Sequence, residues 1–276
     1  MDYLDTSALK ILLINTNMIN DKVVVGAMCV GRDVDMLNIT IHNLLKYSDW
    51  VVLLLDNETP EVMQLVLDYQ RKYYGKIWLR RSSFPHEIVR GPTKSLDHRH
   101  RWKAIKGYVR DEVFFHIRRI LDLKSDKYSK IDILLFPDQD EIFTDYLPEL
   151  LEKLWDSNKQ GVSLKMVHVV NDMFTIKQDL MGPHFHIMKY TRELRGYPWQ
   201  FFNMFHPITG SQIMKVNYYS VHLPYLTTSS RKFRDENWKK LRLDGAQLWT
   251  LDKSVVEMSP KEISDTFLRK PDKIFK

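Results

Sequence analysis

The chain has 276 residues, of which 44% are hydrophobic, so it is long enough for one large globular domain and too apolar to be intrinsically disordered. Its single cysteine, Cys29, excludes an internal disulfide and a cysteine-rich zinc site. The net charge is +6, and nine Lys or Arg against two acidic residues lie between positions 80 and 110, which suits a polyanionic ligand or, alternatively, a solvated helix face.

Strands and helices alternate along the first 170 residues. Thr59 and Pro60 have the residue types of a helix N-cap and a first helical turn. Alternation of this kind produces βαβ units, so we predict an α/β fold whose central sheet is mainly parallel and flanked by helices. The predicted strands are 22–30, 50–55, 76–79, 131–136 and 162–170, and the predicted helices are 36–45, 59–74, 99–121 and 146–155.

Three acidic side chains follow one of these strands directly. The apolar run 131–136 is short enough for a buried strand, and Asp138, Asp140 and Glu141 come where it ends. Carboxyl ends of strands border the usual ligand crevice of an open α/β sheet. Mg²⁺ and Mn²⁺ prefer oxygen ligands and accept phosphate oxygens beside them, so we predict a metal–diphosphate site. The alternative is an acidic loop that caps the next helix.

The pattern changes beyond residue 171. Aromatic residues, His and Pro gather in short segments at 184–186, 198–202 and 218–222, which predicts a smaller, loop-rich part with antiparallel strands. No run of about 18 apolar residues occurs, so we expect no membrane span. The N-terminus is acidic and unlike a secretory signal, which predicts a cytoplasmic protein.

The order of these features resembles a GT-A glycosyltransferase of the family-2-like group, in which a strand ends in an Asp-x-Asp-Glu-aromatic sequence. Here residues 138–143 read Asp-Gln-Asp-Glu-Ile-Phe, and the resemblance covers about residues 22–170 with a weaker tail to His222. It implies a GT-A, Rossmann-like fold. Residues 1–170 would form the nucleotide-sugar-binding half, and 171–276 the acceptor-binding part of the same domain, with C-terminal helices.

The resemblance also implies roles for individual donor-side residues. Asp56 matches the acid that meets the nucleotide base or ribose, and Arg99 or Arg101 matches an Arg near the diphosphate. Asp138 and Asp140 match the motif that binds the diphosphate and its Mn²⁺ or Mg²⁺, with Asp140 preferred as the direct ligand.

Further roles follow from the same resemblance. His222 matches a late His that completes the metal site, and Glu141 would support the ligands from behind. For His222, the alternative is a core histidine whose ring is hydrogen-bonded within the protein. Arg32 and Asp33 stand in the donor-side turn where such enzymes usually hold Asn-Glu.

Sugar transfer by inversion needs a carboxylate base near the acceptor hydroxyl. Asp172 is our first choice because it directly follows a predicted strand, and Asp179 and Glu193 are the alternatives. An acceptor would contact Trp199, His184 and His186, although Trp199 belongs to an aromatic cluster that also suits ordinary core packing.

Three functions remain open at this point. The first is a metal-dependent glycosyltransferase whose acceptor is a glycan, a lipid-linked saccharide or a hydroxylated base in DNA, the last suggested by the basic stretches at 80–110 and 231–242. The second is a metal-dependent nuclease or nucleotidyltransferase, which also uses clustered carboxylates and a basic face. The third is a non-catalytic nucleic-acid-binding protein.

Overall fold

The computed structural model describes residues 21–31, 34–56, 58–83, 98–123, 129–170, 175–177, 184–196, 205–225 and 255–257. Its first half contains β1 (Val24–Val30), α1 (Val34–Lys46), β2 (Trp50–Leu55), α2 (Pro60–Lys72), β3 (Ile77–Arg81), α4 (His98–Asp122), β4 (Ile133–Leu135), β5 (Glu141–Phe143), α5 (Leu147–Asp156) and β6 (Gly161–Val170). It continues with β7 (Thr175–Lys177), β8 (His184–Lys189), β9 (Arg195–Gly196), β10 (Phe205–His206), the 3₁₀-helix η3 (Gly210–Gln212), β11 (Ile213–Tyr225) and β12 (Val255–Glu257).

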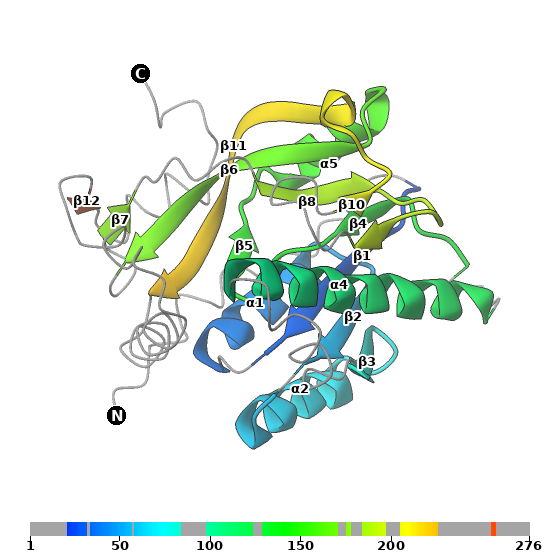
Figure 1. The fold of residues 1–276 in the computed structure, drawn as a ribbon, viewed down its shortest axis with the longest axis vertical. Helices are drawn as coiled ribbons and strands as arrows, with labels where there is room; N and C mark the ends of the chain where they lie inside the picture. Colours follow the sequence, from blue (N-terminus) through cyan, green and yellow to red (C-terminus); the bar gives the residue numbers. More distant parts are fainter. Residues whose placement is uncertain are drawn as a thin grey trace.

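One large sheet organises the described part of the molecule (Figure 1). Its strand order is β12-β7-β6-β8-β4-β1-β2-β3, and β11 joins β6 and β5. Strands β4, β1, β2 and β3 are parallel to one another, whereas β8 is antiparallel to both β4 and β6. The predicted fold class is therefore confirmed: an α/β fold with a parallel sheet flanked by helices and a smaller antiparallel part.

Helices cover both faces of the parallel strands because those strands carry apolar side chains on both faces. On β2, Val51 and Leu53 pack in one cluster with the apolar sides of α1, α2 and α5, while Val52 and Leu54 pack with α4 on the opposite face. All six residues of β2 are buried. The continuous apolar strands of the sequence thus form the middle layer of a three-layer sandwich.

The boundaries of several elements agree closely with the sequence predictions. Thr59 is the N-cap of α2, as predicted, and its hydroxyl oxygen accepts a hydrogen bond from the Val62 N–H, with Pro60 in the first turn. The segment 218–222 is part of β11, which has 13 residues and pairs with two strands. No helix among the described residues is long and apolar enough to cross a membrane.

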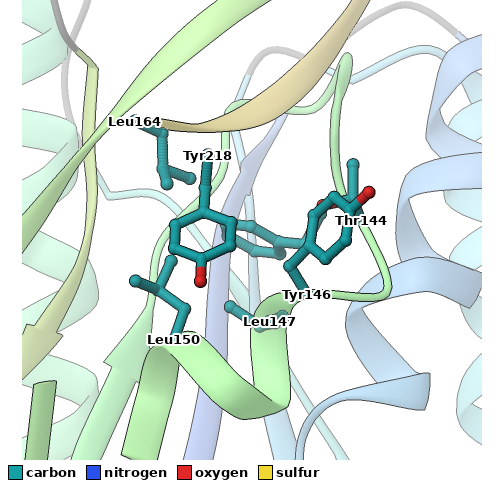
Figure 2. Close-up of a pocket in the computed structure, with 7 residues that line it drawn as sticks. Thr144, Tyr146, Leu147, Leu150, Leu164 and Tyr218 are labelled. Atoms are coloured by element: carbon teal, nitrogen blue, oxygen red, sulfur yellow. The ribbon is translucent and has the colours of Figure 1, made fainter. Parts of the chain in front are cut away.

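A packing gap of about 10 Å³ lies between α5 and β11 (Figure 2). Its walls are largely apolar, and Tyr146 and Tyr218 face each other there with ring centroids 5.5 Å apart. A gap of this volume holds at most one water molecule, so it is a feature of the core and not a ligand site.

Gly196→Ala is expected to destabilise the fold by about 1–3 kcal/mol, the usual cost of overpacking. A Cβ at Gly196 would lie 2.2 Å from the backbone oxygen of Gly107 and 2.7 Å from the backbone nitrogen of Asp111, and backbone atoms of α4 cannot move aside as a side chain can. Urea unfolding measures the loss. Gly210→Ala is the matched control, because a Cβ there meets nothing within 4 Å; equal stability of the two variants would contradict the close approach.

Candidate active site

The acidic segment lies at the point where the strand order reverses. The chain passes from β1 to β2 and β3 in one direction across the sheet, and β4 then returns to pair with the other side of β1. Ligands of open α/β sheets bind beyond the carboxyl ends of strands at such a reversal. Asp138 follows β4 and Gly31 follows β1, so both residues stand at this edge.

A hydrogen-bonded turn carries the carboxylates. Pro137 has no N–H to continue the ladder, and β4 has ended by this residue. The Glu141 N–H donates to the Asp138 carbonyl (3.1 Å), which closes a turn over residues 138–141. The Gln139 side-chain oxygen accepts a hydrogen bond from the Gly31 N–H (2.6 Å), and the Gln139 backbone carbonyl accepts one from the Thr40 hydroxyl (2.8 Å). These contacts fasten the turn to the end of β1 and to α1.

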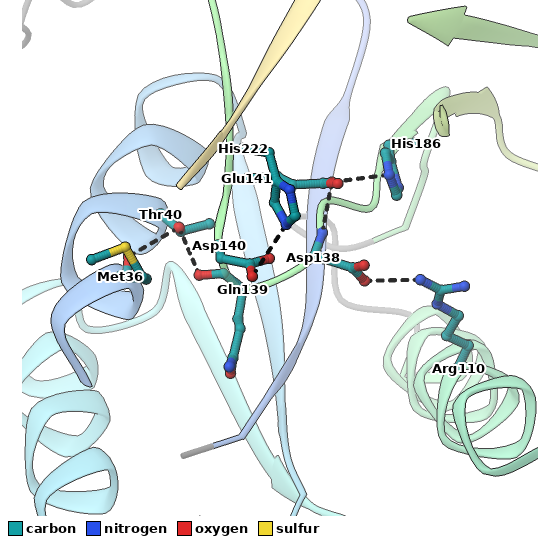
Figure 3. Close-up of polar contacts among 9 residues, drawn as sticks. All are labelled: Met36, Thr40, Arg110, Asp138, Gln139, Asp140, Glu141, His186 and His222. Carbon is teal, nitrogen blue, oxygen red and sulfur yellow. Dashed lines mark hydrogen bonds and ion pairs between the residues drawn. The ribbon is translucent and has the colours of Figure 1, made fainter. Parts of the chain in front are cut away.

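Asp140 points toward His222 (Figure 3), and the resemblance assigned both residues to one metal site. Its Oδ2 lies 3.2 Å from His222 Nε2, and their side chains are 5% and 16% exposed. The pairing of β5 with β11 produces this contact, because Glu141 lies opposite His222 in the register and Asp140 immediately precedes Glu141. Residues 82 positions apart thus meet through two neighbouring strands.

The spacing of Asp140 and His222 is that of two neighbouring ligands of one divalent cation. Two neighbouring ligands of an octahedral ion at about 2.1 Å lie roughly 3 Å apart, close to the observed Oδ2–Nε2 separation. Among the described side chains no group of three or more His, Cys, Asp or Glu gathers in a way that would hold a metal. Mg²⁺ and Mn²⁺ sites commonly use one or two protein ligands and take the remainder from phosphate and water.

Asp138, the third predicted ligand, does not form a group of three with Asp140 and His222 among the described side chains. Instead its Oδ1 accepts a hydrogen bond from Arg110 Nη2 at 2.8 Å, and Figure 3 shows the side chain turned toward α4. The guanidinium is 4% exposed and the carboxylate 26%. The physical reason is charge compensation, because a buried Arg requires a carboxylate partner.

Arg110, beside the acidic turn, had no role predicted from the sequence. It belongs to the basic stretch 80–110, but the structure buries it on the sheet-facing side of α4, beside Val109 and Val113. The sequence held one signal for this role: a charged residue at a position of the apolar stripe of the helix. Such a residue is buried only with a partner, and the acidic residues 138–141 were already a site candidate.

Glu141 and His186 form a second buried pair behind the turn. His186 Nε2 lies 2.9 Å from Glu141 Oε2, and the side chains are 1% and 2% exposed. His186 Nδ1 also contacts the Phe136 carbonyl at 2.8 Å. Both ring nitrogens therefore contact the protein, which does not favour the predicted contact of His186 with an acceptor. The supporting role of Glu141 behind the ligands stays a prediction.

The other predicted residues are distributed as follows. Asp56 follows β2 at the same edge of the sheet, and its N–H donates to the Val30 carbonyl at 2.8 Å. Arg99 and Arg101 belong to the first turns of α4 and His184 begins β8, but their side chains are outside the described part. Arg32, Asp33, Asp172, Asp179 and Trp199 lie outside the described residues.

A cavity of about 460 Å³ lies over the outer face of α4, apart from these carboxylates. Its lining includes the exposed rings of Tyr108 and Phe115. Several of its polar groups already serve the fold: Glu112 accepts from both the backbone and the hydroxyl of Ser83, and Arg118 donates to the Leu194 carbonyl.

Comparison with known proteins gave likenesses only to solved structures: no protein-family model and no curated protein matches the chain. S. aureus TarS residues 1–349 in complex with UDP is 12% identical, with a TM-score of 0.43 over 87% of this chain and 76% of that one. GalNAc-T7 with UDP, GalNAc and Mn²⁺ is 11% identical, with a TM-score of 0.45 over 90% of this chain.

A 4-diphosphocytidyl-2C-methyl-D-erythritol synthase from Anaerococcus prevotii DSM 20548 is 13% identical, with a TM-score of 0.32 over 91% of this chain and 84% of that one. The chain spans 56% of GalNAc-T7 and 66% of TarS 1–349 without UDP. At identities of 11–13% and TM-scores below 0.5, these likenesses decide neither the activity nor the site.

Proposed function

We propose that the protein is a metal-dependent glycosyltransferase, which moves a sugar from a nucleotide-diphosphate sugar to a hydroxyl acceptor. The observation that carries the proposal is the contact of Asp140 with His222 at the reversal point of the sheet, with the Arg110–Asp138 pair beside it. A nucleoside diphosphate is an anionic leaving group. This site offers it a pair of cation ligands, beside a buried Arg110 whose charge is compensated by Asp138.

Asp140 and His222 would hold Mn²⁺ or Mg²⁺. These ions need no further protein ligand, because phosphate oxygens and water can fill the remaining coordination positions. When bound, the ion stabilises the negative charge that grows on the diphosphate as the bond to the sugar breaks. The two side chains hold these two atoms 3.2 Å apart. A carboxylate and an imidazole nitrogen at this distance share a proton, so binding of the ion would release that proton from the pair.

Arg110 and Asp138 would orient the donor. A carboxylate accepts up to about four hydrogen bonds, and Asp138 is 26% exposed, so it can accept from donor hydroxyls while Arg110 holds it. The guanidinium charge is buried, where charges interact more strongly than in water. Asp56, at the end of β2, is proposed to contact the base or ribose, and Arg32, Asp33 and Arg99 or Arg101 the rest of the donor.

The roles of the acceptor-side residues are proposed from the sequence. Asp172 is proposed as the base that takes the proton of the attacking hydroxyl, and Trp199 and His184 as acceptor contacts. The acceptor is proposed to be a glycan or lipid-linked saccharide, with a hydroxylated base in DNA as the second choice. A DNA acceptor would make binding fall steeply with salt, because phosphate contacts release counterions.

Nucleotide-sugars with Mn²⁺ are expected to stabilise the protein. A donor at a hundred times its dissociation constant raises the free energy of unfolding by about 2.7 kcal/mol. Thermal unfolding with UDP-, GDP- and CMP-sugars, each with Mn²⁺ and with EDTA, measures the effect, and slow release of free sugar identifies the donor. No stabilisation by any of them, together with cleavage of phosphodiester bonds, would instead indicate a nuclease.

A further inference from the structure

The turn that carries Asp138 and Asp140 is held at both ends by one side chain, that of His186. The Phe136 carbonyl, two residues before Asp138, contacts His186 Nδ1 at 2.8 Å. Glu141, the residue after Asp140, contacts His186 Nε2 at 2.9 Å. The backbone reinforces the first contact, because the Phe136 N–H donates to the His186 carbonyl at 2.7 Å.

Glu141 connects His186 to the backbone of the turn. Its Oε2 accepts a hydrogen bond from the Asp138 N–H at 3.1 Å, while its own N–H donates to the Asp138 carbonyl. Both polar backbone groups of Asp138 are therefore bound to Glu141. Figure 3 shows His186, Glu141 and Asp138 in this order, with the Asp140 carboxylate leaving the turn toward His222.

The chemistry of the contacts requires a histidine and a carboxylic acid together. A carbonyl oxygen can only accept, so Nδ1 donates to Phe136. Nε2 then faces a carboxylate oxygen, and this contact is favourable only when one proton lies between the two atoms. A side chain that reaches only one of these two partners leaves the other unsatisfied, which is costly because the pair is buried.

We propose that His186 is a positioning residue for the cation and donor site: it fixes the curvature of the turn so that Asp140 meets His222 at the spacing of two metal ligands. This rests on the proposed function, since it assigns His186 to the same site. Removing a partner that orients metal ligands typically weakens metal binding about 10- to 100-fold.

Two substitutions separate the two contacts of the ring. In His186→Asn the amide nitrogen takes roughly the place of Nδ1 and keeps the bond to Phe136, but the contact with Glu141 is lost. In His186→Gln the amide nitrogen takes roughly the place of Nε2 and keeps the contact with Glu141. Because Glu141 carries the restraint to Asp138, His186→Gln is expected to retain more Mn²⁺ affinity than His186→Asn.

The test is the affinity for Mn²⁺ in the presence of UDP, measured on the full chain from the electron paramagnetic resonance signal of free Mn²⁺. We expect His186→Asn to weaken it about 10- to 100-fold and His186→Gln to weaken it less. Val66→Ala, a buried truncation on α2, controls for general destabilisation, and its affinity is expected to equal that of the parent. Urea unfolding identifies any variant that fails to fold. If His186→Asn fails to fold, the Mn²⁺ affinity of His186→Gln is compared with that of the parent instead.

The outcomes separate this inference from the proposed function. Parent-like Mn²⁺ affinity in both His186 variants would overturn the positioning role alone. An equal loss in Val66→Ala would overturn it too, because the effect would then follow stability. Absence of Mn²⁺ and UDP binding by the parent would overturn the proposed function and this inference with it.

Discussion

Asp140→Asn is expected to lower the rate of sugar transfer by at least about a hundredfold while the protein remains folded. The substitution keeps the size of the side chain and removes the negative charge that would hold the cation. An Asn oxygen still reaches the position 3.2 Å from His222 Nε2, so the loss of stability should be small. Donor turnover with Mn²⁺ measures activity, and circular dichroism with thermal unfolding measures the fold.

Asp68→Asn is the matched control for this variant. It also removes one carboxylate charge, but Asp68 lies on α2 and is 58% exposed, where it pairs with Arg71. Its activity is expected to equal that of the parent. If Asp140→Asn were as active as this control, the carboxylate would have no part in donor activation. Loss of the folded state in Asp140→Asn would mean that the acid is structural.

Arg110→Met is expected to lower the free energy of unfolding by about 3 kcal/mol, near the lower end of the cost of breaking a buried ion pair. The lower end applies because Asp138 is 26% exposed and water can partly solvate it once Arg110 is gone. Donor affinity should fall in the same variant, since Asp138 would no longer be held. Urea unfolding and Mn²⁺-dependent donor binding measure the two effects separately.

Two further variants test the cause of this effect. Adding Asp138→Asn to Arg110→Met should recover part of the stability, because the uncompensated carboxylate is then absent. Arg71→Met breaks an exposed pair with Asp68, and such pairs contribute about 0–1 kcal/mol. A cost for Arg110→Met no larger than that of Arg71→Met would show that the pair with Asp138 adds nothing to stability.

The parts of the fold that depend on local pattern could be predicted from the sequence. The apolar run 50–55 forms β2 with the predicted bounds, and Thr59 and Pro60 begin α2, because capping and burial are decided by neighbouring residues. The predicted strand 131–136 is shorter in the structure, where only Ile133–Leu135 is β4. Strand ends depend on the partners of the backbone, and those partners are distant in sequence.

The site could be predicted only in part for the same reason. Asp138 and Asp140 were visible because they follow a buried strand. The contact of Glu141 with His186 depends on the antiparallel pairing of β8 with β4, and no local pattern indicates that register. Arg110 had a local signal, a charge within an apolar stripe, but its partner is 28 residues away.

Co-crystallisation with Mn²⁺ and UDP tests whether Asp140 and His222 bind the metal, because the anomalous scattering of manganese locates the ion without reference to activity. We expect one anomalous peak within about 2.3 Å of an Asp140 carboxylate oxygen and of His222 Nε2, with diphosphate oxygens completing the coordination. UDP bound with no manganese peak at these two side chains, or manganese bound elsewhere on the protein, would contradict it.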